Sequence, residues 1–192
     1  MKNAEVKKIK KVLEKNLDSK RYEHTVGVEY TAMCLAMCHD VSLENAQLAG
    51  ILHDCAKCMS DEKKLSFCEK HNISVNAIEK KKPSLLHAKV GSFLAMEEYH
   101  VENQDIINAI LNHTTGRPGM SKLEKIVFIA DYIEPGRKQA PNLEEIRKLA
   151  FVDLDHALLR ILEDTLIYLK QNDDVIDPMT QKTYDYYKKG EL

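Results

Sequence analysis

The sequence is short of the residues that interrupt regular structure. Its 192 residues include seven glycines and five prolines, which together make up about half of their usual share in soluble proteins. This scarcity excludes collagen-like repeats and Pro/Gly-rich disordered chains, and it argues against turn-rich β-sandwiches. A chain of this length is expected to form one domain whose core buries roughly 70% of the surface of the unfolded chain.

Long apolar runs and a strong net charge are also missing. No stretch approaches the roughly 18 apolar residues of a membrane span, and the N-terminal lysines lack the apolar core of a signal peptide. We therefore expect a cytoplasmic protein that binds neither membrane nor nucleic acid, because 28 basic and 30 acidic residues leave a net charge of -2. An anionic ligand would have to meet positive charge locally. The five cysteines are an odd number, and in an unexported chain they are expected to be reduced.

The apolar residues recur at helical spacing, and no segment alternates as a half-buried strand would. Ser19 and Ser42 are expected to cap helices, because a serine side chain can accept the free amide hydrogens of a first turn. The predicted helices cover residues 6–17, 19–39, 42–58, 61–71, 84–99, 105–115, 121–134, 143–149 and 152–169. With a polar tail from Gln171, residues 1–192 are predicted to form a single compact all-α bundle.

Several predicted helices place an ionisable residue on an apolar face. In one of them Ala46, Ala49, Gly50 and His53 share a face, and their small side chains would let another helix approach closely. A buried neutral histidine is tolerated when its nitrogens find partners, but a buried carboxylate without a cation is far more costly. The residues on such faces are His24, His53 with the adjacent Asp54, His87, His113 and Asp131.

Four histidines and two aspartates form a mixed nitrogen and oxygen ligand set that suits Fe, Mn, Co or Zn. Each residue taken singly could be a satisfied core histidine, or a carboxylate paired with a neighbouring Lys or Arg. Five apolar faces together favour a metal site. Within a His-Asp pair, the aspartate can also bridge two metal ions.

The other four histidines are not expected to be ligands. His39 and Asp40 repeat the His-Asp dipeptide, but at the polar end of a predicted helix. His71 and His100 follow charged stretches and are expected at helix ends, where the negative end of the helix dipole favours a protonated histidine. His156 is expected on the surface.

Two further sequence features narrow the chemistry. Cys55 and Cys58 have no second pair at zinc-ribbon spacing and are expected to be small buried side chains of the third helix. The chain has neither a G-x-x-x-x-G-K-[ST] nor a G-x-G-x-x-G motif. A phosphorylated ligand would therefore be held by metal ions and cationic side chains rather than by a glycine-rich loop.

The order of His24, His53-Asp54, His87, His113 and Asp131 resembles that of the HD-domain metal-dependent phosphohydrolases, in their dinuclear form. Within that superfamily, the segments ILHDCAK, LLHAKVG, ILNHTTG and IADYIEPGR resemble the YqeK family of symmetrical dinucleoside-tetraphosphate hydrolases. The similarity covers residues 19–140, and residues 141–192 are expected to pack on that part.

The resemblance implies an HD-domain helical bundle with two divalent metal ions in its core, iron first, with Mn, Co or Zn as alternatives. It also implies hydrolysis of a nucleotide substrate, diadenosine tetraphosphate, to two ADP by a metal-bound hydroxide. A homodimer is compatible with it. The implied metal ligands are His24, His53, Asp54 as the bridge, His87, His113 and Asp131. The implied catalytic residues are Asp54 and Lys57, and the implied substrate contacts are His24, Asp54, Lys57, His87, His113, Thr114, Arg137, Asp177 and Thr180.

Three other functions remain open at the level of the sequence. Another HD phosphohydrolase, such as a nucleotidase or a cyclic-dinucleotide or alarmone hydrolase, would use the same ligands. A di-iron oxygenase would be expected to offer Glu-x-x-His ligands, and none falls on an apolar face. A non-catalytic metal- or nucleotide-binding module is disfavoured, because six protein ligands leave two octahedral ions with positions for water and substrate.

Overall fold

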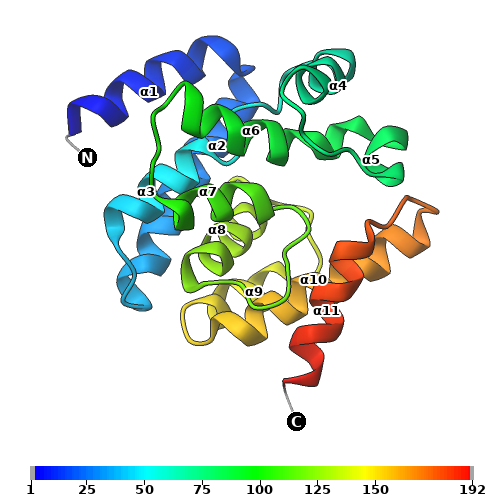
Figure 1. Cartoon of the computed structure of the whole chain (residues 1–192). Helices are drawn as coiled ribbons and strands as arrows, with labels where there is room; N and C mark the ends of the chain where they lie inside the picture. Colours follow the sequence, from blue (N-terminus) through cyan, green and yellow to red (C-terminus); the bar gives the residue numbers. More distant parts are fainter. Residues whose placement is uncertain (1–2, 191–192) are drawn as a thin grey trace.

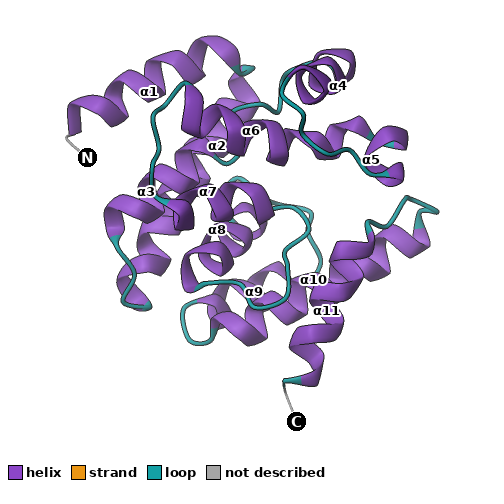
Figure 2. Cartoon of the chain, viewed as in Figure 1, coloured by secondary structure: helices purple, strands orange, loops and turns teal. Residues whose placement is uncertain are grey.

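The computed structural model describes residues 3–190, and every regular element in that range is helical (Figures 1 and 2). The all-α prediction is therefore confirmed. None of these helices combines the length and the apolar character needed to cross a lipid bilayer. In chain order the elements are α1 (Asn3–Asn16), α2 (Ser19–Cys38), α3 (Leu43–Leu52), α4 (Asp61–Lys70), α5 (Ala77–Lys81), the 3-10 helix η1 (Pro83–Leu86), α6 (His87–Glu97), α7 (Gln104–Asn112), α8 (Lys122–Ile133), α9 (Leu143–Ala150), α10 (Leu154–Gln171) and α11 (Pro178–Lys189).

The helix starts agree with the sequence at Ser42 and differ at Ser19. The Ser42 hydroxyl accepts the amide hydrogen of Asn45 at 3.3 Å and caps α3, as predicted. Ser19 is instead the first residue of α2, and the preceding Asp18 is the cap, accepting the amide hydrogen of Arg21 at 2.8 Å. A carboxylate both accepts the hydrogen bond and complements the positive end of the helix dipole.

The third helix is shorter than predicted. It ends at Leu52 and not near Cys58, because the chain turns away in tight steps. The amide of Cys55 donates to the Leu52 carbonyl at 3.1 Å, and the amide of Lys57 donates to the Asp54 carbonyl at 2.9 Å. This change of direction lets His53 and Asp54 leave the helix together.

Two helical regions were not predicted. Helix α5 lies before the helix that was predicted to begin at Ser84, and α11 lies in the tail that was expected to be polar. The first residues of the helix predicted from Ser84 form the 3-10 helix η1, and α6 follows it. Helix α11 has few apolar residues, so its periodicity is weak. Its start nevertheless carries a recognisable signal, since Asp177 is the cap and Pro178 is the first helical residue.

Helix α8 is the central element of the bundle. It packs against α2, α3, α7, α9 and α10, and it lies in the middle of the view in Figure 1. The main core runs from α1 to α10, while a smaller cluster under α4, η1 and α6 contains Ala56, Cys68, Leu86 and Val90. Helix α10 packs on α8 and α9, and α11 packs on α10.

The predicted close approach of α3 to another helix is confirmed. A Cβ atom added to Gly50 would lie 2.9 Å from the Cα atom of Glu29 on α2. Because this neighbour is backbone, no side chain can move aside to make room. The glycine therefore sets the distance between α2, which carries His24, and α3, which leads into His53 and Asp54.

Substitution of Gly50 by alanine is expected to lower the free energy of unfolding by about 1–3 kcal/mol, since overpacking forces the backbone apart. Denaturant unfolding would measure it. Gly190→Ala is the matched control, because its Cβ would lie in ordinary contact, 3.6 Å from the Tyr187 carbonyl oxygen. Equal stability of the two variants would contradict this account of the packing of α2 and α3.

Candidate metal centre

The six candidate ligands lie within five helices or at their ends, and their side chains converge on one centre. His24 lies in the first half of α2, and Asp131 lies near the end of α8. The other four stand at helix boundaries. His53 ends α3 and is followed by Asp54, His87 begins α6, and His113 ends α7. Helices that are far apart in the sequence thereby supply side chains to one centre.

The donor atoms form two overlapping groups. Those of His24, His53 and Asp131 lie within 4.8 Å of one another, and so do those of His53, Asp54 and His113. His87 joins the second group, since its Nε2 atom lies 3.2 Å from Asp54 Oδ1 and 3.0 Å from His113 Nε2. The structure thus brings together all six residues that the sequence singled out.

The Nδ1 atoms of three histidines face backbone carbonyl oxygens. A carbonyl only accepts hydrogen bonds, so each Nδ1 carries the hydrogen and each Nε2 presents its lone pair to the centre. In each case the acceptor lies three residues earlier, in the turn that ends at the histidine. The pairs are His53 with Gly50 at 2.7 Å, His87 with Ser84 at 2.6 Å and His113 with Ile110 at 2.7 Å.

Three buried atoms that could coordinate a metal ion lack a hydrogen-bond partner among the described residues. They are His24 Nε2, His53 Nε2 and Asp54 Oδ1. The Asp54 side chain is only 1% exposed. Buried polar atoms without partners are costly, and a cation bound among them would remove that cost. Imidazole nitrogens and carboxylate oxygens suit a first-row divalent metal ion, so the residues fit such an ion.

The protonation of the buried groups agrees with this chemistry. Burial lowers the pKa of His87 to about 4, so its imidazole is neutral near pH 7, which is the form that coordinates metal ions. Burial also lowers the pKa of the Lys57 ammonium, and the charges of Asp54 and Asp131 partly offset this effect.

Cationic side chains surround the carboxylates. Lys57 Nζ lies 3.2 Å from His87 Nε2 and 3.8 Å from Asp54 Oδ1, and Arg137 Nη2 donates to Asp131 Oδ1 at 2.8 Å. The sequence did not single out Arg21, whose Nη1 donates to Asp54 Oδ2 at 2.8 Å. Its position three residues before His24 on α2 was the available signal, because residues at that spacing share a helix face.

The remaining predicted substrate contacts lie in the loop after His113 and at the start of α11. The Thr114 hydroxyl is 3.2 Å from His113 Nε2 and 3.4 Å from His87 Nε2. Asp177 accepts a hydrogen bond from the Asn76 side chain at 3.3 Å, and Thr180 is buried. Helix α11 is tied to the loop by the Thr183 hydroxyl, which donates to the Thr115 carbonyl at 3.1 Å.

The other histidines lie where the sequence placed them. His39 and His71 end α2 and α4. His100 follows the end of α6, and His156 is exposed. The His39 Nε2 atom lies 2.7 Å from the Ala150 carbonyl oxygen.

The expectation for the two spaced cysteines was wrong. Cys55 and Cys58 lie beyond the end of α3, and the Cys58 side chain is exposed while Cys55 is half-buried. The early turn after Leu52 is the reason, because it carries Cys58 to the rim, where its thiol donates to Asp18 Oδ2 at 3.4 Å. All five thiols are free.

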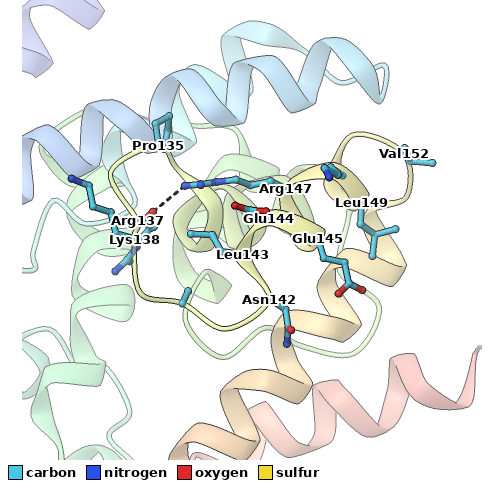
Figure 3. Close-up of a pocket in the computed structure, with 12 residues that line it drawn as sticks. Pro135, Arg137, Lys138, Asn142, Leu143, Glu144, Glu145, Arg147, Leu149 and Val152 are labelled. Carbon is cyan, nitrogen blue, oxygen red and sulfur yellow. Dashed lines mark hydrogen bonds between the residues drawn. The ribbon is translucent and has the colours of Figure 1, made fainter.

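A cavity of about 1020 Å³ lies on the outer side of the loop between α8 and α9. Arg137 and Arg147 line it, and none of the six candidate ligands does (Figure 3). Arg147 donates through Nε to the carbonyl of Ile133 at 2.9 Å, and through Nη2 to those of Glu134 at 2.9 Å and Arg137 at 3.0 Å. This one side chain therefore fixes the loop that carries Arg137 toward the centre.

Known proteins of similar sequence show the family of this chain. The sequence pattern of the HD domain matches residues 21–136. The symmetrical bis(5'-nucleosyl)-tetraphosphatase of Bacillus subtilis is 38% identical over 93% of this chain and 95% of its own length. The protein of the same name from Halalkalibacterium halodurans is 41% identical over 88% of this chain and 90% of its own length.

A solved structure has the same fold. The crystal structure of an HD superfamily hydrolase from Clostridium acetobutylicum, described as involved in NAD metabolism, matches with a TM-score of 0.92. It is 38% identical in sequence and covers 96% of this chain, which covers 97% of it. The chain belongs to the HD-domain family, and within it to the family of the symmetrical bis(5'-nucleosyl)-tetraphosphatases.

His53 contributes to both donor groups, so His53→Ala is expected to weaken metal binding by more than about 100-fold, since even outer-shell partners cost 10–100-fold. His39→Ala is the matched control and should leave metal content unchanged, although it alters the same kind of His-Asp dipeptide. Metal analysis of both purified variants would measure this. Loss of metal in His39→Ala would contradict the assignment of the centre.

Proposed function

We propose that this protein hydrolyses symmetrical dinucleoside tetraphosphates, cleaving diadenosine tetraphosphate into two ADP. The observation that carries the proposal is the cluster of six residues with nitrogen and oxygen donors, three of whose buried atoms have no hydrogen-bond partner among the described residues. The names of the relatives from Bacillus subtilis and Halalkalibacterium halodurans support the same substrate. The protein would act in the cytoplasm on this small nucleotide, without nucleic acid, as a single HD domain of residues 1–192.

Two metal ions would be held by the six residues, with Asp54 as the bridge. Two donor groups support this number, because they share only His53 and each has its own carboxylate, Asp131 in one and Asp54 in the other. Iron is the proposed metal, with Mn, Co or Zn able to use the same donors. When bound, the ions would supply Lewis-acid polarisation of phosphate oxygens and lower the pKa of a bound water toward neutrality.

The cationic side chains would bind and orient the polyphosphate. Arg137 offers a planar fork that matches two phosphate oxygens, and its side chain is 41% exposed, so a ligand can reach it. The Lys57 ammonium lies near Asp54 Oδ1 and close to His87 Nε2. The Thr114 hydroxyl can donate to a phosphate oxygen beside His113, while Asp177 and Thr180 would border the nucleoside.

The reaction consumes one water molecule. Its oxygen forms a bond to one of the two central phosphorus atoms, and the bond from that phosphorus to the central bridging oxygen breaks. One proton of the water is released, the other stays on a terminal phosphate oxygen of one product, and both products leave as ADP. Asp54 would orient the water, which is supported by its Oδ1 atom being buried and having no hydrogen-bond partner among residues 3–190.

Another HD phosphohydrolase activity is the alternative, because the ligand set does not select the nucleotide. Product analysis in ¹⁸O-labelled water would separate the two. The proposal expects ADP alone, with one ¹⁸O atom in one of the two ADP molecules from each reaction. AMP and ATP as products, or turnover of a mononucleotide in place of the tetraphosphate, would refute it.

Asp54→Ala is expected to abolish metal binding and hydrolysis together, since it removes the bridging carboxylate from the middle of the donor cluster. Arg137→Ala should keep the metal ions and lower kcat/KM by roughly 10- to 100-fold, the value of a hydrogen bond to a charged group. Metal analysis and steady-state kinetics on both variants would decide. Full activity of Asp54→Ala would contradict the proposed site.

A further inference from the structure

Glu134 is a buried carboxylate that no candidate role has used. It follows the last residue of α8 and is only 4% exposed. Its Oε1 atom lies 3.1 Å from His24 Nδ1, and its Oε2 atom accepts the amide hydrogen of Gly136 at 2.5 Å. Each carboxylate oxygen therefore meets a different hydrogen-bond donor.

His24 differs from the other three histidines of the centre in how its Nδ1 atom is held. His53, His87 and His113 use carbonyl oxygens at helix boundaries. His24 stands inside α2, where nearby carbonyl oxygens are engaged in the helix. A side chain from another element has to supply the acceptor, and Glu134 does so.

The surroundings of Glu134 are shaped for its carboxylate. A Cβ atom added to Gly27 on α2 would lie 2.6 Å from Glu134 Oε2, and one added to Gly136 would lie 2.9 Å from both oxygens. Two missing side chains therefore leave the space that the carboxylate fills. Arg147 holds the same loop through the Glu134 carbonyl oxygen.

We propose that Glu134 is a positioning residue for His24. By accepting the Nδ1 hydrogen it fixes the tautomer and the ring orientation, so that the Nε2 lone pair is available to a metal ion held between His24 and Asp131. The His24 Nε2 atom is buried, has no hydrogen-bond partner in the described part of the chain and lies 3.0 Å from Asp131 Oδ1. The inference rests on the metal site of the proposed function, but not on the identity of the nucleotide.

Glutamine is the informative replacement because it has nearly the same shape. A carboxylate accepts from both His24 and Gly136, whereas an amide offers one oxygen and one NH2 group. If the oxygen faces His24, the NH2 group opposes the Gly136 amide. If it faces Gly136, the NH2 group donates to His24 Nδ1, and the ring then carries its hydrogen on Nε2, where the metal ion should bind.

The experiment measures metal affinity and histidine tautomers in the full chain. Glu134→Gln is expected to weaken metal binding by about 10- to 100-fold in chelator competition, as for other outer-shell partners of histidine ligands. ¹⁵N NMR of the chelated protein should show a hydrogen on His24 Nδ1 in the wild type, and a loss of that hydrogen in the variant. Glu144→Gln, which alters an exposed carboxylate on α9, should change neither measurement.

Gly27→Ala provides a second variant that leaves Glu134 itself in place. Its Cβ would displace the carboxylate, so it should weaken metal binding in the same direction. Unchanged metal affinity and an unchanged His24 tautomer in Glu134→Gln would overturn the positioning role while the wild type still cleaves the tetraphosphate. A wild type without that hydrolysis, but with metal loss on Glu134→Gln, would instead overturn the proposed function and support the role of Glu134.

Discussion

Asp54 is buried among the imidazoles of His53, His87 and His113, and the surrounding helices are arranged around this carboxylate. Its carboxylate is almost fully removed from water, and Arg21 satisfies one oxygen while the other has no hydrogen-bond partner among the residues that the structure describes. A buried carboxylate of this kind needs compensating positive charge. The helices therefore have to end where they direct imidazole nitrogens, cationic side chains and the metal ion toward this position.

The helix boundaries meet that requirement with backbone groups. At the ends of α3 and α7 and at the start of α6, a carbonyl oxygen orients each histidine, so the turn at each helix boundary also orients a candidate ligand. His24 and Asp131 lie within helices, and the loop after α8 provides their partners in Glu134 and Arg137. Arg147 ties this loop to α9, which couples the centre to a helix beyond the HD-domain match.

The features that the sequence did not predict share a physical origin in long-range contacts. Helix α11 has a weak apolar period, and it is stabilised by Thr183 meeting the loop of Thr115. Arg21 and Glu134 are charged residues whose positions depend on partners 33 and 110 positions away. Cys58 was expected to be a buried side chain of the third helix. The helix ends at Leu52, so Cys58 lies beyond it and is exposed, while Asp54 is buried.

The all-α class, most of the helices and the six candidate donors could be predicted from the sequence, because burial on one face of a helix imposes a period that apolar and ionisable residues both follow. The sequence also separated His39 from His53, since only one of the two dipeptides continues an apolar face. The tertiary structure decided which nitrogen of each histidine faces the centre and which charged residues surround it. Those properties depend on atoms from several helices meeting within hydrogen-bonding distance, and no local pattern specifies such a meeting.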